Sequence, residues 1–204
     1  MNSGENGKKL FPPHGGYKKL ITYKVGLLIY DATFAFCNRW ISKKDRTHDQ
    51  MVQAARSGVA NIAEGSAASA TSKKTELKLT NVAKASQEEL LFDFQSILRQ
   101  HNLIEWDSED PKVLFIRNAR IDNLDELREL MRKILSDLSD TSDLSDRTAV
   151  FLEVACNTMI TLINQEISLL DKQIAKLADD FLKNGGFSER MYHTRKSSRD
   201  NGGR

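Results

Sequence analysis

The residue types that catalyse reactions or bind metal ions occur in this 204-residue chain, but they are not grouped. Neither Cys37 nor Cys156 has a second ligand at the spacing of a zinc site, and both fall in apolar patterns typical of buried, unpaired thiols. Glu88, Glu89 and Asp93 would share one helix, yet a di-iron bundle needs inward Glu-x-x-His motifs, which are missing. The histidines are scattered, at positions 14, 48, 101 and 193. We expect no metal, no cofactor and no enzymatic activity.

The sequence also contains clustered lysine and arginine residues, whose side chains can bind the phosphate groups of nucleic acids. The residues expected to contact nucleic acid flank the first helix and begin the third: Lys18, Lys19, Lys43, Lys44, Arg46, Lys73, Lys74 and Lys78. The same residues fit an ordinary solvent-exposed surface with no ligand about equally well. The Lys43–Arg46 and Lys73–Lys74 groups fall in turns at opposite ends of the second helix, so they would not form one patch within a subunit.

Charge is distributed unevenly along the chain, although its net value is only +2. Residues 1–100 carry 15 Lys/Arg and 9 Asp/Glu, whereas residues 101–180 carry 9 and 17. A basic half and an acidic half can steer a polyanion to one side, or can let subunits attract each other. The charge alone does not choose between these uses.

Apolar residues recur at helical spacing through most of the chain, and only three residues are proline. The pattern predicts helices over about 17–41, 47–64, 72–101 and 122–138, with Ser72 as an N-cap and Pro111 at a first helical position. The longest pattern covers about 147–183. The apolar seam of the first helix is expected at Leu20, Tyr23, Leu27, Tyr30, Phe34, Cys37 and Ile41.

These helices predict an all-α fold, an antiparallel up-down four-helix bundle followed by one long C-terminal helix. The expected organisation is a flexible lead-in over 1–16, the bundle over 17–138, a Ser/Asp-rich hinge over 139–146, a suffix helix over 147–184 and a disordered basic tail over 185–204. No window has the roughly 20 consecutive apolar residues of a membrane span. We therefore expect a cytoplasmic protein.

The segment 50–65 carries the most specific pattern in the chain. Met51, Ala55, Val59 and Ile62 fall on one helical face. Gly65 is predicted to end the helix, with Asn61 and Glu64 bonding backbone at the turn or across a subunit boundary. The residues of this structural motif are Gln50, Ala54, Ala55, Ser57, Asn61, Glu64 and Gly65. None is paired with a nucleophile or a base, which favours an architectural role over catalysis.

Three segments together, 49–65, 72–74 and 83–90, resemble the four-helix bundle proteins encoded in intervening sequences of large-subunit ribosomal RNA genes. That family includes the accessory variability determinant of diversity-generating retroelements. The resemblance covers about residues 20–138 and implies a bundle that assembles into a ring, usually a pentamer, with no established enzymatic activity. The added helix after residue 146 looks like the variant of the family in which the bundle carries a C-terminal suffix helical domain. For the retroelement members it also implies binding of nucleic acid and of a reverse transcriptase.

The chain departs from the family pattern at two places in the second helix. Val52 and Gln53 stand where basic residues often precede the paired alanines, which weakens the carry-over of nucleic-acid binding to this helix. Gly58 replaces a branched residue, at a cost of up to about 1 kcal/mol in helix propensity, and suggests a close helix or subunit contact.

The expected function is that of a non-enzymatic, homo-oligomeric scaffold or adaptor. RNA or DNA would bind at the basic bundle ends, and the suffix helix would dock a protein partner or extend the oligomer. The alternative is a pure protein-protein interaction module that partners a reverse transcriptase or another effector encoded nearby. A catalytic bundle, the third option, predicts metal in the purified protein.

Overall fold

The computed structural model describes residues 16–138, 144–184, 191, 192 and 196, and within these it is helical with no strand. This confirms the predicted all-α class. The elements are a 3₁₀ turn η1 (Tyr17–Lys19) and the helices α1 (Ile21–Trp40), α2 (Arg46–Ala68), α3 (Lys73–Gln100), α4 (Pro111–Asn118), α5 (Leu124–Leu138) and α6 (Leu144–Asn184). None of these helices combines the length and apolar character that crossing a bilayer requires.

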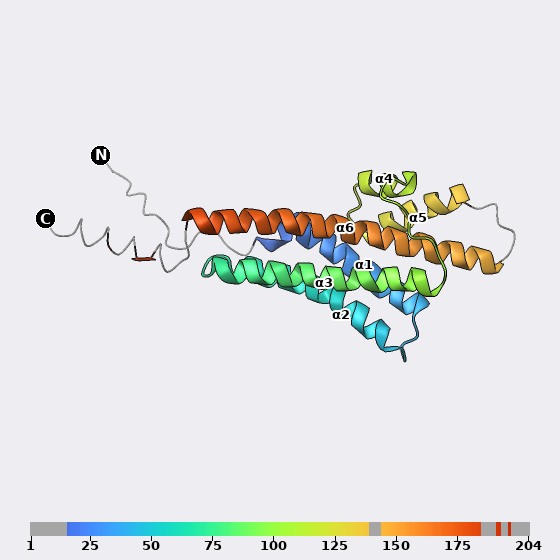
Figure 1. Ribbon diagram of the computed structural model, residues 1–204, viewed down its shortest axis with the longest axis horizontal. Coiled ribbons are helices and arrows are strands. Elements are labelled where there is room, and N and C mark those ends of the chain that lie inside the picture. Colours follow the sequence, from blue (N-terminus) through green and yellow to red (C-terminus); the bar gives the residue numbers. More distant parts are fainter. Residues whose placement is uncertain (1–15, 139–143, 185–190, 193–195, 197–204) are drawn as a thin grey trace.

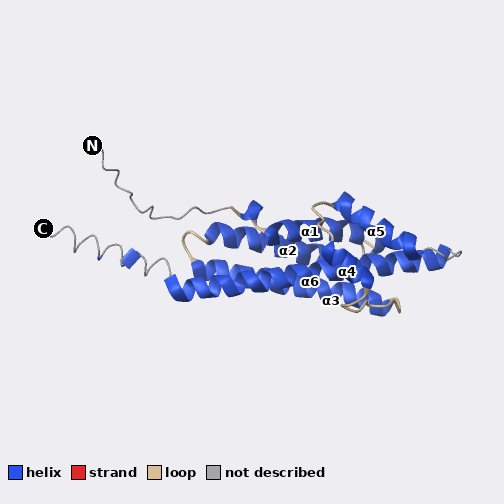
Figure 2. Cartoon of the chain, turned by 90° about the horizontal axis from the view of Figure 1, so that it is seen from above, coloured by secondary structure: helices blue, strands red, loops and turns tan. Residues whose placement is uncertain are grey.

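The four long helices α1, α2, α3 and α6 form one elongated antiparallel bundle (Figures 1 and 2). Each packs against two others, since α6 closes the arrangement by contacting both α1 and α3. The direction of α6 follows from its partners on α1. Thr22 near the start of α1 donates to Gln173 Oε1 at 2.9 Å, and the Trp40 ring at the end of α1 stacks on Phe151 at 5.7 Å.

The fourth long helix is therefore α6, which differs from the expectation that residues 122–138 complete the bundle and residues 147–184 form a suffix. Helix α5 instead packs on α6 and α1, and α4 packs on α6 (Figure 1). The physical reason is the sequence of α6, where every residue from 154 to 163 is buried. A helix that is buried on all sides belongs at the centre, whereas α5 has a single apolar face.

One hydrophobic core consequently joins segments that the sequence pattern assigned to separate modules. Leu28 and Phe36 of α1, Leu90 of α3, Leu127 of α5 and Ile163 of α6 all belong to it. The lead-in 1–16 and the tail 185–204 lie almost wholly outside the described residues. So does the hinge over 139–143, while residues 144–146 already belong to α6.

The face that α1 buries is also different from the expected seam. Leu27 and Phe34, both predicted to be internal, are 39% and 50% exposed. The helix instead buries Gly26, Ile29 and Thr33, because α1 lies between α2 and α6 and its smaller residues allow the close approach. It also starts later than predicted, since the extended backbone at residue 20 separates it from the 3₁₀ turn.

Side-chain caps explain where several helices begin. Ser72 Oγ accepts from Thr75 N at 3.1 Å and starts α3, as predicted. Asp45 Oδ1 accepts from Thr47 N at 2.9 Å and starts α2. Pro111 occupies the first turn of α4, also as predicted, because its ring fixes a helical φ and the missing N–H costs nothing there.

The prediction that Gly65 ends the second helix is wrong, because α2 continues to Ala68. Gly65 is buried within the helix and faces the first turns of α3. A Cβ added there would lie 3.4 Å from both Glu76 O and Leu79 Cβ. The glycine therefore provides room for the α2–α3 crossing instead of a left-handed cap.

Candidate nucleic-acid interface

The structure brings five of the eight predicted phosphate-binding residues, all of them lysines, to one end of the bundle. The start of α1, the turn between α2 and α3 and the end of α6 all lie at this end (Figures 1 and 2). Lys18 and Lys19 are in η1, which packs against α1 and α2. Lys73, Lys74 and Lys78 occupy the first turns of α3. We call these five residues the α3-start cluster.

The members of the α3-start cluster differ in how available their ammonium groups are. Lys73 Nζ donates to Glu76 Oε2 at 2.8 Å, so that charge is already matched within its own helix. Lys18, Lys19, Lys74 and Lys78 are exposed and have no acidic partner among the residues that the structure describes. These four side chains can reach an external anion without breaking an existing contact.

The other three predicted residues, Lys43, Lys44 and Arg46, lie at the opposite end of α2 and are exposed. Asp45 stands among them, but its carboxylate is held by the amide of Thr47, and that hydrogen bond lowers its pKa. A helix of 23 residues separates the two groups by about 35 Å. A single subunit therefore presents two basic surfaces.

The structural motif of α2 divides between the core and a shallow polar groove. Ala55 is buried in the core together with Met51 and Ile62. Gln50, Ala54 and Ser57 line the groove beside Ser86 and Glu89 of α3, with a volume of about 430 Å³.

Hydrogen bonds along this groove fix the α2–α3 pair. Ser86 Oγ donates to Ser57 Oγ at 3.0 Å, which links the two helices directly. Asn61 Nδ2 donates to the carbonyl of Ser57 at 2.8 Å, so it bonds backbone within its own helix and not at a turn. Glu64 is exposed near the end of α2. These contacts give Ser57 and Asn61 a role in holding the two helices together.

Gly58, where the chain departs from the family pattern, faces the buried Gln87 of α3. A Cβ at Gly58 would lie only 2.5 Å from Gln87 Nε2. Both polar atoms of the Gln87 amide are buried and have no hydrogen-bond partner in the described structure. The close contact that the glycine suggested is therefore with α3 of the same chain.

The titratable groups of the core do not form a metal centre. Within the described part of the chain, no three His, Cys, Asp or Glu side chains come together as ligands would. Both cysteines are free and buried, and burial raises the pKa of each thiol to about 12, with Asp93 adding to the effect at Cys37. Burial, and secondarily Glu89, raises the pKa of Asp93.

The sequence analysis missed a polar clamp formed by Glu153 and Asn157 of α6. Asn157 Oδ1 accepts from Trp106 N at 2.8 Å, and its Nδ2 donates to Ile104 O at 2.8 Å. Glu153 Oε1 accepts from the Trp106 indole N–H at 3.0 Å. The clamp fixes the connection between α3 and α4. Its only sequence signal is two polar residues four apart in an otherwise apolar stretch.

Comparisons with known proteins add no relative: no family model, no curated protein and no solved structure matches this chain.

Proposed function

We propose that this protein is a non-enzymatic helical scaffold that binds RNA or DNA through the basic ends of its bundle. The observation that carries the proposal is the α3-start cluster, where four exposed lysines from η1 and α3 lie at one end without an acidic partner in the described structure. The resemblance of residues 20–138 to a family with nucleic-acid-binding members supports the same ligand class.

Lysines on helix ends bind phosphates as point charges and do not read base sequence. The expected binding is therefore indifferent to sequence and depends strongly on salt, since each neutralised phosphate releases a counterion. The exposed group Lys43, Lys44 and Arg46 provides a second contact about 35 Å away, so a long strand can engage both ends.

Titration of labelled single-stranded RNA and DNA at about 50 and 200 mM salt tests the proposal. We expect binding that weakens steeply with salt. In the Lys74→Glu/Lys78→Glu variant the salt slope should fall by about two, one for each lost phosphate contact. Lys133→Glu, an exposed residue of α5 at the other end of the bundle from the α3-start cluster, is the control and should keep the salt slope of the wild type.

Three results would contradict the proposal. They are no binding by the wild type at low salt, binding that does not depend on salt, and an equal loss of affinity in Lys133→Glu and Lys74→Glu/Lys78→Glu.

The second part of the proposal is self-association, for which the family resemblance implies a pentameric ring. Leu27 and Phe34, seven residues apart on one face of α1, are exposed, and so is Phe92 on α3. Contiguous apolar surface marks interaction sites, so we propose the face of α1 that carries Leu27 and Phe34 as the contact between subunits. A ring would repeat the α3-start cluster in every subunit and so multiply weak phosphate contacts.

Exposed Leu182, near the end of α6, favours a protein partner as the second candidate function. Residues 154–163 of the same helix are buried in the bundle, so docking of a reverse transcriptase or other effector along this stretch would require unfolding. A partner would therefore meet α6 outside this stretch, and the exposed Leu182 favours its last turns. Loss of partner capture in Leu182→Asp, with nucleic-acid binding absent in the wild type, would favour this function over the first.

A further inference from the structure

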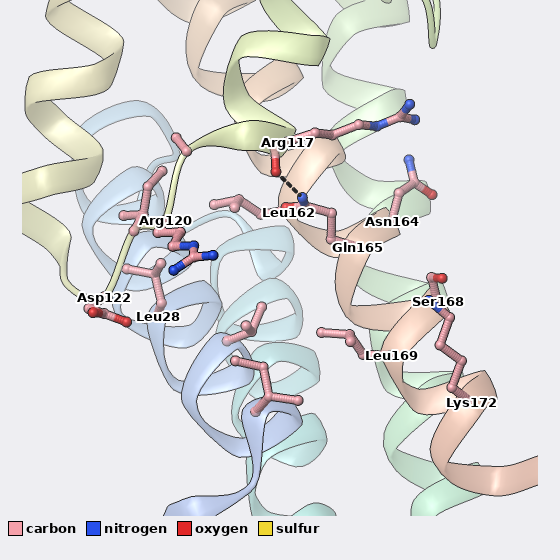
Figure 3. A pocket seen from close by; sticks show the side chains of 14 residues that line it. Leu28, Arg117, Arg120, Asp122, Leu162, Asn164, Gln165, Ser168, Leu169 and Lys172 are labelled. Carbon is pink, nitrogen blue, oxygen red and sulfur yellow. Dashed lines mark hydrogen bonds between the residues drawn. The ribbon is translucent and has the colours of Figure 1, made fainter. Parts of the chain in front are cut away.

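An open groove of about 620 Å³ runs between α1, α6 and the connection from α4 to α5. Its floor is apolar and is made by side chains from all three: Ile21, Val25, Leu28, Ile121, Leu162 and Leu169. Figure 3 shows Leu162 and Leu169 pointing from α6 into the space beside α1. The volume lies within the range of small-molecule sites.

Three cations and one carboxylate stand around this apolar floor: Arg117, Arg120, Lys172 and Asp122. Arg120 enters from the α4–α5 connection, and Lys172 lies on the opposite side on α6 (Figure 3). Arg120 and Lys172 form no hydrogen bond or ion pair with any residue that the structure describes. Arg117 donates to the carbonyl of Ser108, at 3.2 Å. The groove therefore combines an apolar floor with unmatched positive charge.

A neighbouring groove of about 500 Å³ under α5 does not have this combination of an apolar floor and unmatched positive charge. Its lining also contains three cations, all of them arginines, but their charges are engaged. Arg128 and Arg132 each pair with an acidic residue three positions earlier in α5. Arg39 lies 4.8 Å from the centre of the Phe151 ring. An anion entering that groove would have to displace existing contacts. The groove between α1, α6 and the α4–α5 connection, which we call the Arg120 groove, requires no such exchange.

We propose that the Arg120 groove binds a small amphipathic anion, a straight hydrocarbon chain that ends in a carboxylate. The chain lies on the leucine and isoleucine floor, and the carboxylate meets the guanidinium of Arg120. The charge of Lys172, on the other side of the groove, adds to the positive potential that attracts the anion. Guanidinium groups pair with carboxylates through two parallel hydrogen bonds, so Arg120 is the main anchor. This site is separate from the α3-start cluster and does not depend on nucleic-acid binding.

Calorimetric titration of the full-length protein with decanoate tests the site, with decanol and decyltrimethylammonium as ligands of matched chain length. We expect decanoate to bind, decanol to bind at least about tenfold more weakly, and the cation not to bind. Affinity should rise from octanoate to decanoate, because each added methylene reaches more of the apolar floor.

Variants at the rim separate a specific site from general adhesion to apolar surface. Arg120→Gln should weaken decanoate binding about tenfold, and Lys172→Gln should weaken it by a smaller factor. Lys176→Gln, one turn further along α6 and outside the groove, is the matched control and should leave the affinity unchanged. All three side chains are exposed, and thermal unfolding checks that each variant is folded.

The absence of decanoate binding would overturn the proposal. So would decanol binding as tightly as decanoate, or an Arg120→Gln affinity equal to that of Lys176→Gln.

Discussion

The carboxyl group of Glu166 on α6 packs against Gly26 on α1, so closely that a Cβ on Gly26 would lie 3.3 Å from Glu166 Oε1. Val59 and Ile62 of α2 approach the same point. Glu166 is fully buried, and neither of its oxygens has a hydrogen-bond partner in the described structure. Burial in these apolar surroundings raises the pKa of the carboxyl group to about 9. The bundle core therefore holds a protonated acid at neutral pH.

The first prediction is that Glu166 makes the protein less stable as pH rises. Its pKa is about 9 in the folded state and 4.5 when exposed, so between these values the folded protein keeps a proton that the unfolded chain releases. The free energy of unfolding should fall by roughly 1 kcal/mol per pH unit over this window, with no further loss from this group above it. Urea unfolding at several pH values measures the slope.

Two variants isolate the contribution of Glu166 from that of the other titrating groups. Glu166→Gln keeps the shape and removes the charge, so its stability should lack this part of the pH dependence. Glu166→Leu also removes the unpaired oxygens. At pH 8 its free energy of unfolding should exceed that of the wild type by about 1–3 kcal/mol or more. A Glu166→Gln profile parallel to that of the wild type would show that the carboxyl does not titrate in this way.

The second prediction concerns Gly65, which lies inside α2 and not at its end. Gly65→Ala should stabilise the protein by up to about 1 kcal/mol, because alanine favours the helix and its Cβ would make ordinary contacts at 3.4 Å. Gly65→Leu should destabilise it, since a longer side chain would meet the backbone of Glu76. Thermal unfolding distinguishes a glycine inside the helix from one that ends it. If Gly65 ended the helix, both substitutions would make the protein less stable.

The third prediction is that Asn157 holds the connection between α3 and α4. Asn157→Ala leaves the buried amide of Trp106 and the carbonyl of Ile104 without their partner, which should cost about 1–3 kcal/mol. Amide hydrogen exchange should also become faster in residues 102–110. Asn164→Ala, an exposed position on the same helix, is the control. Because alanine favours the helix more than asparagine does, Asn164→Ala should not lose stability, and an Asn157→Ala variant as stable as Asn164→Ala would contradict this role.

The fourth prediction tests self-association through α1. Leu27→Asp/Phe34→Asp should lower the fraction of oligomer measured by sedimentation velocity. Both side chains are exposed in a single chain, so neither substitution removes a side chain from the core. Val154→Asp, a buried residue of α6, should instead unfold the chain and separates the two effects. A monomeric wild type, or a double variant that assembles unchanged, would exclude this face as the contact.

The sequence predicted local structure well where one short-range signal decides it. Ser72 caps α3 and Pro111 begins α4 as expected, because a capping hydroxyl and a proline ring act on their own helical turn. The burial of both cysteines also followed from their apolar neighbours. For the candidate interface, the sequence identified the lysines but did not show that Lys73 is paired with Glu76.

The arrangement of the helices was decided by tertiary packing. Periodicity finds an apolar stripe on a helix but does not say which helix will cover it, so Leu27 and Phe34 of α1 were expected inside and lie outside. For the same reason, residues 147–184 were predicted to form a suffix helix outside the bundle, although residues 154–163 of α6 are buried on every side. Glu166 and the Arg120 groove depend on close approach between segments far apart in the chain, and Gly65 depends on the crossing of α2 and α3. Local sequence determines which residues form helices, and only packing determines which faces meet.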